Sequence, residues 1–167
     1  MTDTSSTPVS AWADWPLDRE VVVTRVVAAD IDTAFRAWAD PEQIVQWFGP
    51  EGLDIRTHEI DIRTGGVWRF DMVGADVTFP NRMEFLRVEA PRLIEAVHGS
   101  DDPQDPDRFR LLVTFDAQDN GKTVVTLRQM HPSAARRSAV IGFGAVEYGG
   151  QTLDKLARHL AAVTGTA

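Results

Sequence analysis

The sequence contains no cysteine, and this absence removes a whole group of chemistries from consideration. Disulfide bonds, thiolate nucleophiles, iron–sulfur clusters and thiolate-ligated zinc all need cysteine, so each is excluded. No apolar run approaches the roughly 20 residues that a transmembrane helix needs. Residues 1–8 lack the basic-then-apolar pattern of a signal peptide. We therefore expect a cytoplasmic protein.

The common motifs of catalysis and cofactor binding are missing as well. There is no phosphate-binding P-loop, no Gly-x-Ser-x-Gly nucleophile turn and no His-Glu-x-x-His zinc motif. The histidines, at positions 58, 98, 131 and 159, do not have the spacing of metal ligands. We therefore predict no metal, no cofactor and no assignable catalytic residue.

Positive charge is scarce relative to negative charge, and the net charge is −8. Nucleic acids and anionic membrane surfaces select for patches of lysine and arginine, so neither is an expected partner. The 167 residues fit one domain with ordinary globular composition. Residues 1–16 are polar and without periodicity, which predicts a flexible tail. Residues 17–164 are expected to form a single domain.

The first structured region begins with a β-branched run that predicts a strand over Glu20–Ala28. Asp30 has the position of an N-cap for a short helix over Ile31–Ala39. Asp40-Pro41 starts a second short helix, because aspartate caps and proline suits the first helical position. Gly49-Pro50 is expected to end that helix.

From Leu53 to Met130 the pattern is that of about six further strands joined by short turns, which predicts an antiparallel sheet. A change of alternation near Arg56–His58 suggests a bulge. Thr64–Gly66 and Asp119–Lys122 read as tight turns. Pro80-Asn81 suggests a break or a bulge, because proline cannot donate a ladder hydrogen bond.

The final segment, Ser133 to Val163, predicts a long amphipathic helix. Four glycines in its first half, each costing roughly 0.5–1 kcal/mol against alanine, mean that the helix breaks there or that something needs the space. They are Gly142, Gly144, Gly149 and Gly150. A long bulged sheet curls, so we expect an α+β fold in which six to seven curved antiparallel strands wrap this helix.

Several stretches of the sequence together resemble one protein family. The segment Asp40–Pro50, which ends in Trp-Phe-Gly-Pro, is the most specific of them. The others are Thr24–Ala29, Arg63–Phe70, Phe79–Phe85, Ala90–Ile94 and Gln151–Ala157. They are similar to bacterial relatives (AHSA-like) of the heat-shock ATPase activator C-terminal domain, in the START-like helix-grip (SRPBCC) superfamily. The resemblance extends from about Leu17 to Val163.

This resemblance implies a helix-grip fold with a cavity between the curved sheet and the long C-terminal helix. It does not imply one activity, because relatives in the superfamily bind lipids, hormones or polyketides and some act as cyclases. The chain departs from the family pattern at Asp30, where proline is common. It departs again at Glu147–Gly150, where many relatives have a Gly-Trp pair, and this second departure concerns the expected cavity wall.

Candidate ligand-binding residues come from the aromatic faces of the strands and from polar residues that are candidates for pointing inward. Such aromatic side chains either line an apolar site or simply fill the core, and the polar ones either face a cavity or lie in solvent. His131 and Arg128 are further inward-pointing candidates outside this set. The candidate set is Trp38, Trp47, Phe48, Trp68, Phe70, Met83, Glu84, Phe85, His98, Phe109, Phe143, Glu147 and Gln151.

Three functions are compatible with these features. The first is a binding protein for a hydrophobic or amphipathic small molecule held between the helix and the sheet. The second is a cofactor-free cyclase or hydratase, in which Glu84, Glu147, His98 or His131 transfers a proton. The third, suggested only by the resemblance, is a chaperone-interacting module. The binding protein is preferred over an enzyme, and Val21–Val27, as an edge strand, makes a homodimer possible.

Overall fold

The computed structural model describes residues 16–165, so the predicted flexible tail lies outside the described residues except for Pro16. The chain alternates a first strand, two short helices, six strands and two final helices. The elements are η2 (Leu17–Arg19), β1 (Glu20–Val27), α2 (Ile31–Ala39), α3 (Pro41–Trp47), β2 (Asp54–Ile60), β3 (Val67–Val73), β4 (Thr78–Glu89), β5 (Leu93–Ser100), β6 (Phe109–Ala117), β7 (Thr123–Met130), α4 (Ala134–Gly142) and α5 (Ala145–Thr164).

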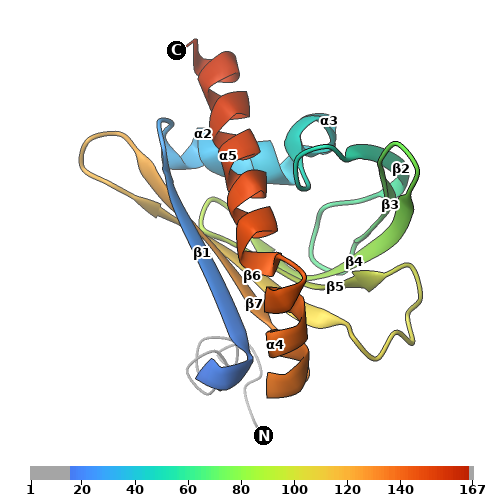
Figure 1. Ribbon diagram of the computed structural model, residues 1–167. Helices are drawn as coiled ribbons and strands as arrows, with labels where there is room; N and C mark the ends of the chain where they lie inside the picture. Colours follow the sequence, from blue (N-terminus) through green and yellow to red (C-terminus); the bar gives the residue numbers. More distant parts are fainter. Residues whose placement is uncertain (1–15, 166–167) are drawn as a thin grey trace, which may run out of the picture.

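The seven strands form one antiparallel sheet in the order β1-β7-β6-β5-β4-β3-β2. Strands β2 to β7 form a continuous meander, and β1 pairs with β7 from Glu20↔Met130 to Val27↔Thr123. The helices α2 and α3 carry the chain from β1, at one edge, to β2, at the other. The sheet curves around α5, which crosses its concave side (Figure 1). This arrangement confirms the predicted α+β helix-grip fold.

The two short helices begin where the sequence predicts. Asp30 caps α2, since its Oδ1 accepts a hydrogen bond from the backbone N of Thr33 at 2.8 Å. That bond lowers the pKa of Asp30, because it stabilises the charged carboxylate. Asp40 caps α3 through the backbone N of Glu42 at 2.9 Å, and Pro41 takes the first position. The two caps fix where α2 and α3 begin, and these helices then lead the chain across the sheet.

One of the two predicted strand irregularities is confirmed and the other is wrong. The pairing of β2 with β3 shifts between Thr57 and Glu59, as the change of alternation indicates. At Pro80, however, β4 continues without a break and pairs with Asp71 of β3. Pro80 is tolerated because the pairing of β4 with β5 begins only at Asn81. The irregularity of β4 lies further on, between Phe85 and Arg87.

The predicted C-terminal helix is interrupted, and its glycines serve different purposes. The chain leaves α4 at Phe143, and Gly144, with φ of 102°, starts α5. A left-handed φ is costly for any residue with a Cβ, so a glycine allows this break. Gly149 is buried instead, and a Cβ there would lie 3.1 Å from Cγ2 of Val23. The sequence left open whether the glycines mark a break in the helix or a place of close packing. Both occur: the break is at Gly144 and the close packing is at Gly149.

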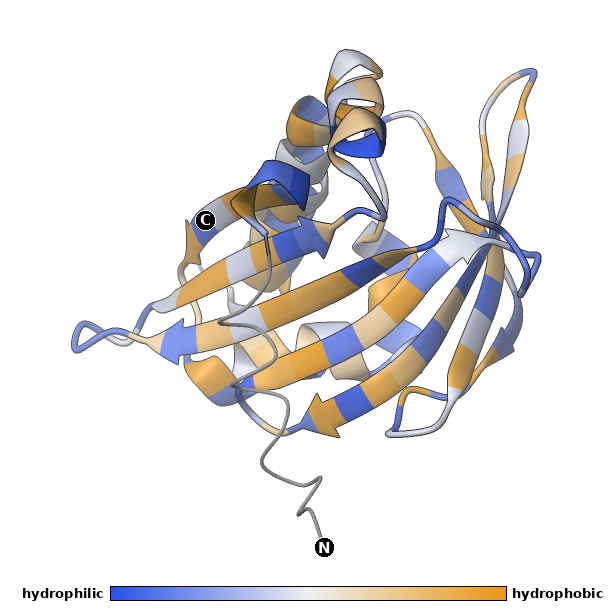
Figure 2. Cartoon of the chain, turned by 90° about the horizontal axis from the view of Figure 1, so that it is seen from below, coloured by the Kyte–Doolittle hydropathy of each residue, from blue (hydrophilic) through white to orange (hydrophobic). Residues whose placement is uncertain are grey.

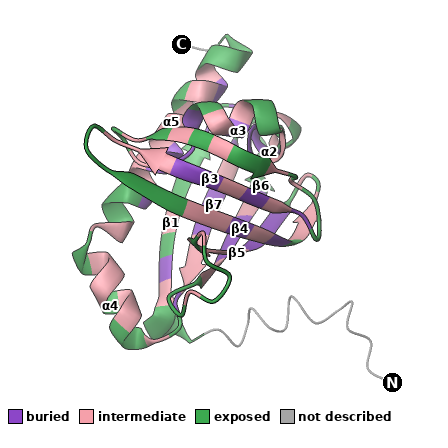
Figure 3. Cartoon of the chain, turned by 90° about the vertical axis from the view of Figure 1, so that its right-hand side faces the viewer, coloured by how far each residue is buried: buried purple, intermediate pink, exposed green. Residues whose placement is uncertain are grey.

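The core lies between the concave face of the sheet and the helices α2, α3 and α5. Apolar and polar residues alternate along the strands, which Figure 2 shows as bands of colour. Leu153, Leu156 and Leu160 of α5 are almost entirely buried against this face. In contrast, α4 has no fully buried residue and lies at one end of the molecule (Figure 3). The buried core is thus formed by the sheet with α2, α3 and α5, and α4 lies at its margin.

Candidate functional site

A cavity of about 290 Å³ lies between the concave face of the sheet and the α4–α5 break. Its floor comes from β5, β6 and β7, its roof from α4 and the first turns of α5, and its end wall from the Trp-Phe-Gly-Pro loop. The lining residues are Phe48, Gly49, Pro50, Met72, His98, Phe109, Leu111, Leu127, Gln129, His131, Val140, Phe143, Ala145, Tyr148, Gly149 and Thr152.

The end wall is held in place by a lysine of the long helix. Nζ of Lys155 lies 3.5 Å from the carbonyl oxygen of Phe48 and 3.4 Å from that of Pro50, and donates to both. Burial lowers the pKa of Lys155, since the charged ammonium is partly removed from water. Gly49 between them has φ of 93°, which allows the sharp turn after α3. The loop that carries the family resemblance is thus fixed to α5.

A row of rings crosses the floor of the cavity from β3 towards the end of β7. The ring centroids of His98 and Phe109 lie 5.0 Å apart, and those of Phe109 and His131 lie 4.9 Å apart. Phe70 continues the row behind His98 at 6.2 Å. The two histidines therefore flank one phenylalanine, and both reach the cavity.

His98 is fixed by a hydrogen bond to the neighbouring strand. Its Nε2 lies 2.9 Å from Oδ1 of Asn81 on β4. The amide nitrogen of Asn81 donates to the carbonyl oxygen of Phe79 at 2.8 Å, which assigns the amide oxygen to the histidine. Nε2 of His98 therefore carries the hydrogen and donates it. Burial lowers the pKa of His98 to about 4, so the ring is neutral at pH 7.

His131, directly after β7, is only 3% exposed. Its Nε2 lies 3.1 Å from Oε1 of Gln129, and its backbone N donates to the carbonyl oxygen of Arg19. Burial, and then the positive charges of Arg136 and Arg137, lower the pKa of His131 to about 4. Its Nδ1 is buried and has no hydrogen-bond partner among the described residues. The cavity wall thus contains a neutral imidazole with one unsatisfied nitrogen.

Four of the thirteen predicted site residues line this cavity: Phe48, His98, Phe109 and Phe143. Phe143 stands at the α4–α5 break and is 70% exposed, so it covers the rim of the cavity and not its interior. The other three are held by the sheet and by the loop after α3. His98 and Phe109 reach the cavity through strand alternation and Phe48 through the loop after α3, and their part in ligand binding stays a prediction.

Six further predicted residues belong to the packed core and line no part of the cavity. The indole of Trp68 stacks on Phe70 with centroids 3.9 Å apart, and Phe48 packs edge-on against Trp68 at 5.2 Å. Such contacts fill the space between α3 and the sheet, because large rings packed at these distances leave no room for a ligand. The six are Trp38, Trp47, Trp68, Phe70, Met83 and Phe85.

The three remaining predicted residues, Glu84, Glu147 and Gln151, lie outside the cavity. Glu84 alternates with the buried Met83, so it lies on the convex face of the sheet, where it pairs with Arg82 at 2.8 Å. Glu147 is exposed on α5. Oε1 of Gln151 accepts from the backbone N of Glu51 at 3.1 Å. The structure therefore does not bring the two glutamates together, because they lie on opposite sides of the sheet.

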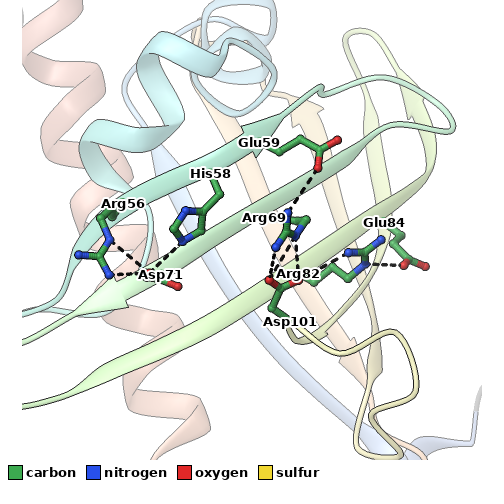
Figure 4. A network of polar contacts seen from close by, with 8 residues as sticks. All are labelled: Arg56, His58, Glu59, Arg69, Asp71, Arg82, Glu84 and Asp101. Carbon is green, nitrogen blue, oxygen red and sulfur yellow. Dashed lines mark hydrogen bonds and ion pairs between the residues drawn. The ribbon is translucent and has the colours of Figure 1, made fainter.

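The convex face carries a network of charged side chains that is separate from the cavity (Figure 4). Oδ2 of Asp71 accepts from Nη2 of Arg56 at 2.7 Å and lies 2.9 Å from Nε2 of His58. Asp101 accepts from Nη2 of Arg69 at 2.7 Å and lies near Arg82. These bonds lower the pKa values of both aspartates. Every cation faces a carboxylate, so the network is a pairing of charges across strands.

Most residues of the roof and several of the floor are not among the thirteen predicted site residues. Strand alternation in β6 and β7 could have identified Leu111, Leu127 and Gln129, because they share a face with Phe109. The glycines of the C-terminal segment indicated a break or a need for space, but they did not show which side chains beside the break would form the roof. The lining residues outside the predicted set, of which His131 alone is named as an inward-pointing candidate, are Gly49, Pro50, Met72, Leu111, Leu127, Gln129, His131, Val140, Ala145, Tyr148, Gly149 and Thr152.

Within residues 16–165, no group of three or more histidine, aspartate or glutamate side chains is arranged to hold a metal ion. In the same part of the chain, no helix is both long enough and apolar enough to cross a membrane. The predicted cytoplasmic location stays a prediction.

Solved structures with the same fold come from several bacteria. A protein from Nitrosomonas europaea superposes with a TM-score of 0.78 at 22% identity, over 90% of this chain and 99% of that one. A protein from Mycobacterium smegmatis gives 0.78 at 24% identity, over 90% and 96%. The AHSA1 protein from Silicibacter pomeroyi gives 0.69 at 20% identity, over 86% and 98%. At these identities the likeness establishes the fold alone.

The comparison of the sequence with proteins of curated function found no match. The family model described as Activator of Hsp90 ATPase homolog 1-like protein matches residues 28–161. The match begins directly after β1 and ends in the last turns of α5, so it includes the loop after α3, the strands β2 to β7 and all the residues that line the cavity. The chain belongs to the Activator of Hsp90 ATPase homolog 1-like protein family.

Proposed function

We propose that the protein binds a small hydrophobic or amphipathic molecule in the cavity between α5 and the sheet. The observation that carries this proposal is the apolar cavity of about 290 Å³ beside a fully packed core. An engineered apolar cavity of about 150 Å³ already binds benzene, so this one has room for a two-ring compound.

Binding is favoured over catalysis by the chemistry of the lining. A cyclase or hydratase needs an acid and a base that titrate near neutral pH. The carboxylates of Glu84 and Glu147 lie outside the cavity. His98 and His131 do reach it, but a pKa of about 4 makes each a weak base at pH 7. These groups are better suited to hydrogen bonding with a ligand than to proton transfer.

The proposal is tested with naphthalene as a probe. Its binding to the protein is measured by isothermal titration calorimetry and by the quenching of tryptophan fluorescence. Ala145 lines the cavity, so Ala145→Phe should fill it and weaken binding at least tenfold. Ala162 lies on the same helix but on its exposed side, so Ala162→Phe is the matched control. Equal binding by both variants would place the probe elsewhere and overturn the proposal. So would a wild-type protein that binds no naphthalene.

The natural ligand is sought by native mass spectrometry of the purified protein, followed by solvent extraction. A defined compound that leaves with the wild-type protein and is missing from Ala145→Phe would identify the ligand class. A possible homodimer would be seen in the same spectrum as a doubled mass. The strand β1 lies at the edge of the sheet, where a second copy would pair with it, and its Val22 and Val26 are each 45% exposed.

A further inference from the structure

A second cavity of about 300 Å³ lies at the α4 end of the sheet and shares part of its lining with the first. The shared residues are His98, Phe109, His131 and Val140. From this common wall the second cavity continues to the loop between β5 and β6 and to Arg136 of α4. A molecule that lies along Phe109 would therefore reach from an apolar space into a polar one.

Arg136 brings an unused hydrogen-bond donor to the second cavity. Its Nε is buried and has no hydrogen-bond partner within residues 16–165. Oδ1 of Asp107 lies 3.7 Å from this Nε, which is close enough for an ion pair but too far for a hydrogen bond. A buried donor without an acceptor costs free energy. An oxygen atom of a ligand placed against this nitrogen would therefore be stabilising.

His131 brings a second unused nitrogen to the same cavity. Its Nε2 is turned to Gln129, and its Nδ1 is buried without a hydrogen-bond partner in the described part of the chain. Burial and the positive charges of Arg136 and Arg137 lower the pKa of this histidine, so the ring is neutral at pH 7. A hydroxyl can pair with Nδ1 whether or not that nitrogen carries the hydrogen, because a hydroxyl both donates and accepts.

The carboxylates beside the second cavity do not supply the missing acceptor. Oδ2 of Asp105 accepts from the backbone N and from Oγ of Ser100, at 3.0 Å and 2.9 Å, and its Oδ1 accepts from the backbone N of Asp107 at 2.9 Å. Asp107 itself is exposed and stays at the ion-pair distance from Arg136. With charges of both signs around one space, the charge alone selects neither a cation nor an anion. The unused donor of Arg136 does distinguish between ligands, because it needs an acceptor.

We propose that the ligand is an amphiphile whose apolar ring body fills the first cavity and whose oxygen-bearing group, a hydroxyl or a carboxylate, lies in the second and accepts a hydrogen bond from Nε of Arg136. This inference rests on the proposed function and adds the chemical class of the ligand. A carboxylate would also be attracted by the charge of the guanidinium, and a hydroxyl would also serve Nδ1 of His131. An ammonium has donors only, so an amine at this place would leave Arg136 without an acceptor.

The test compares four probes with one ring body: naphthalene, naphthol, naphthoate and naphthylmethylamine. Their affinities for the wild-type protein are measured by calorimetry at pH 7. Naphthol, naphthoate or both should bind about fivefold tighter than naphthalene, which is the gain expected from one net hydrogen bond. The probe that gains more identifies the oxygen-bearing group. The amine should bind no tighter than naphthalene, and an amine that binds tightest would overturn the ligand class.

Arg136→Met removes the donor and should abolish the gain of the oxygen probes while the affinity for naphthalene stays the same. Arg137→Met is the matched control. Arg137 is the neighbouring arginine of α4, carries the same charge and lines neither cavity, and its Nε donates to the carbonyl oxygen of Glu20 at 2.7 Å. The control should keep the gain. Equal losses in both variants would show an effect of charge at a distance and would overturn the contact with Arg136.

The outcomes separate the two proposals. If naphthalene binds and Ala145→Phe abolishes its binding, but neither oxygen probe gains, the ligand class is wrong and the binding function stands. If none of the four probes binds, both proposals fail. In the wild-type protein, the ¹⁵N resonances of the His131 ring should shift further on binding of the tighter oxygen probe than on binding of naphthalene. Equal shifts would place the polar group away from the second cavity and overturn the inference.

Discussion

A Cβ atom on Gly149 would lie 3.1 Å from Cγ2 of Val23, so the first half of α5 rests directly on the edge strand β1. A Cβ at this distance would be closer than ordinary van der Waals contact, so the absence of a side chain at Gly149 allows α5 to approach β1 this closely. The neighbouring Gly150 has no atom within 4 Å of the same position. Two adjacent glycines of one helix therefore have different physical reasons to be present.

This difference predicts the result of a pair of substitutions. Gly150→Ala should raise the free energy of unfolding by about 0.5–1 kcal/mol, because alanine favours the helix and meets no neighbour. Gly149→Ala should gain less or lose, because Val23 must move by a few tenths of an ångström. Chemical denaturation measures the free energy of unfolding of both variants. An equal increase in both would mean that α5 does not pack this closely on β1.

The glycines at the α4–α5 break form a second pair. Gly144→Ala should lower the free energy of unfolding by about 1–2 kcal/mol, because its φ of 102° is left-handed. A Cβ there would also lie 3.0 Å from the ring of Tyr148. Gly142→Ala, with no neighbour within 4 Å, should be neutral or slightly stabilising. Thermal denaturation compares the stabilities of the two variants. If Gly144→Ala did not lower the stability, the left-handed break between α4 and α5 would be contradicted.

Lys155→Met should destabilise the protein by about 1 kcal/mol and also weaken naphthalene binding, because the carbonyl groups of Phe48 and Pro50 lose their donor. The matched control is Arg158→Met, which removes an exposed ion pair with Glu51 in the same loop. Exposed pairs contribute little, so the control should change stability and binding less. Calorimetry with naphthalene decides whether the end wall of the cavity, formed by the Trp-Phe-Gly-Pro loop, depends on Lys155.

Stability should fall as the pH is lowered from about 6.5 to 4. The pKa values of His98 and His131 are about 4 in the folded protein against 6.5 ordinarily, so in this window the unfolded chain binds more protons. Each histidine should remove up to about 3 kcal/mol by pH 4. Denaturation at several pH values measures the slope, and His131→Phe should reduce it; an unchanged slope would contradict the burial of His131.

The carboxylates of the convex face act in a different pH window. The pKa values of Asp71 and Asp101 are lowered from 3.8, so their stabilising contributions are lost only as the pH falls below that value. Asp101→Asn should lower the free energy of unfolding at pH 7 by about 1 kcal/mol, since its partner Arg69 is partly exposed. Naphthalene affinity should stay the same, because the sheet separates this network from the cavity.

Much of the fold could be predicted from the sequence because its signals are local. The caps at Asp30 and Asp40, the shift near Thr57 and the alternation along β3 depend on residues close together in the chain. The family resemblance, which is most specific at the Trp-Phe-Gly-Pro loop, predicted how these elements assemble into a helix-grip fold. The error at Pro80 arose because its tolerance depends on where the pairing with β5 begins, which is set by a distant strand.

The site was less predictable because a cavity is what remains after side chains from distant segments have packed. The sequence determined that aromatic residues face inward, but it could not distinguish Trp68, which stacks in the core, from Phe109, which lines the cavity. Strand alternation treats the two alike. Only the tertiary structure decided between them, because α3 covers one end of the concave face, while the α4–α5 break leaves the other end open above His98 and His131.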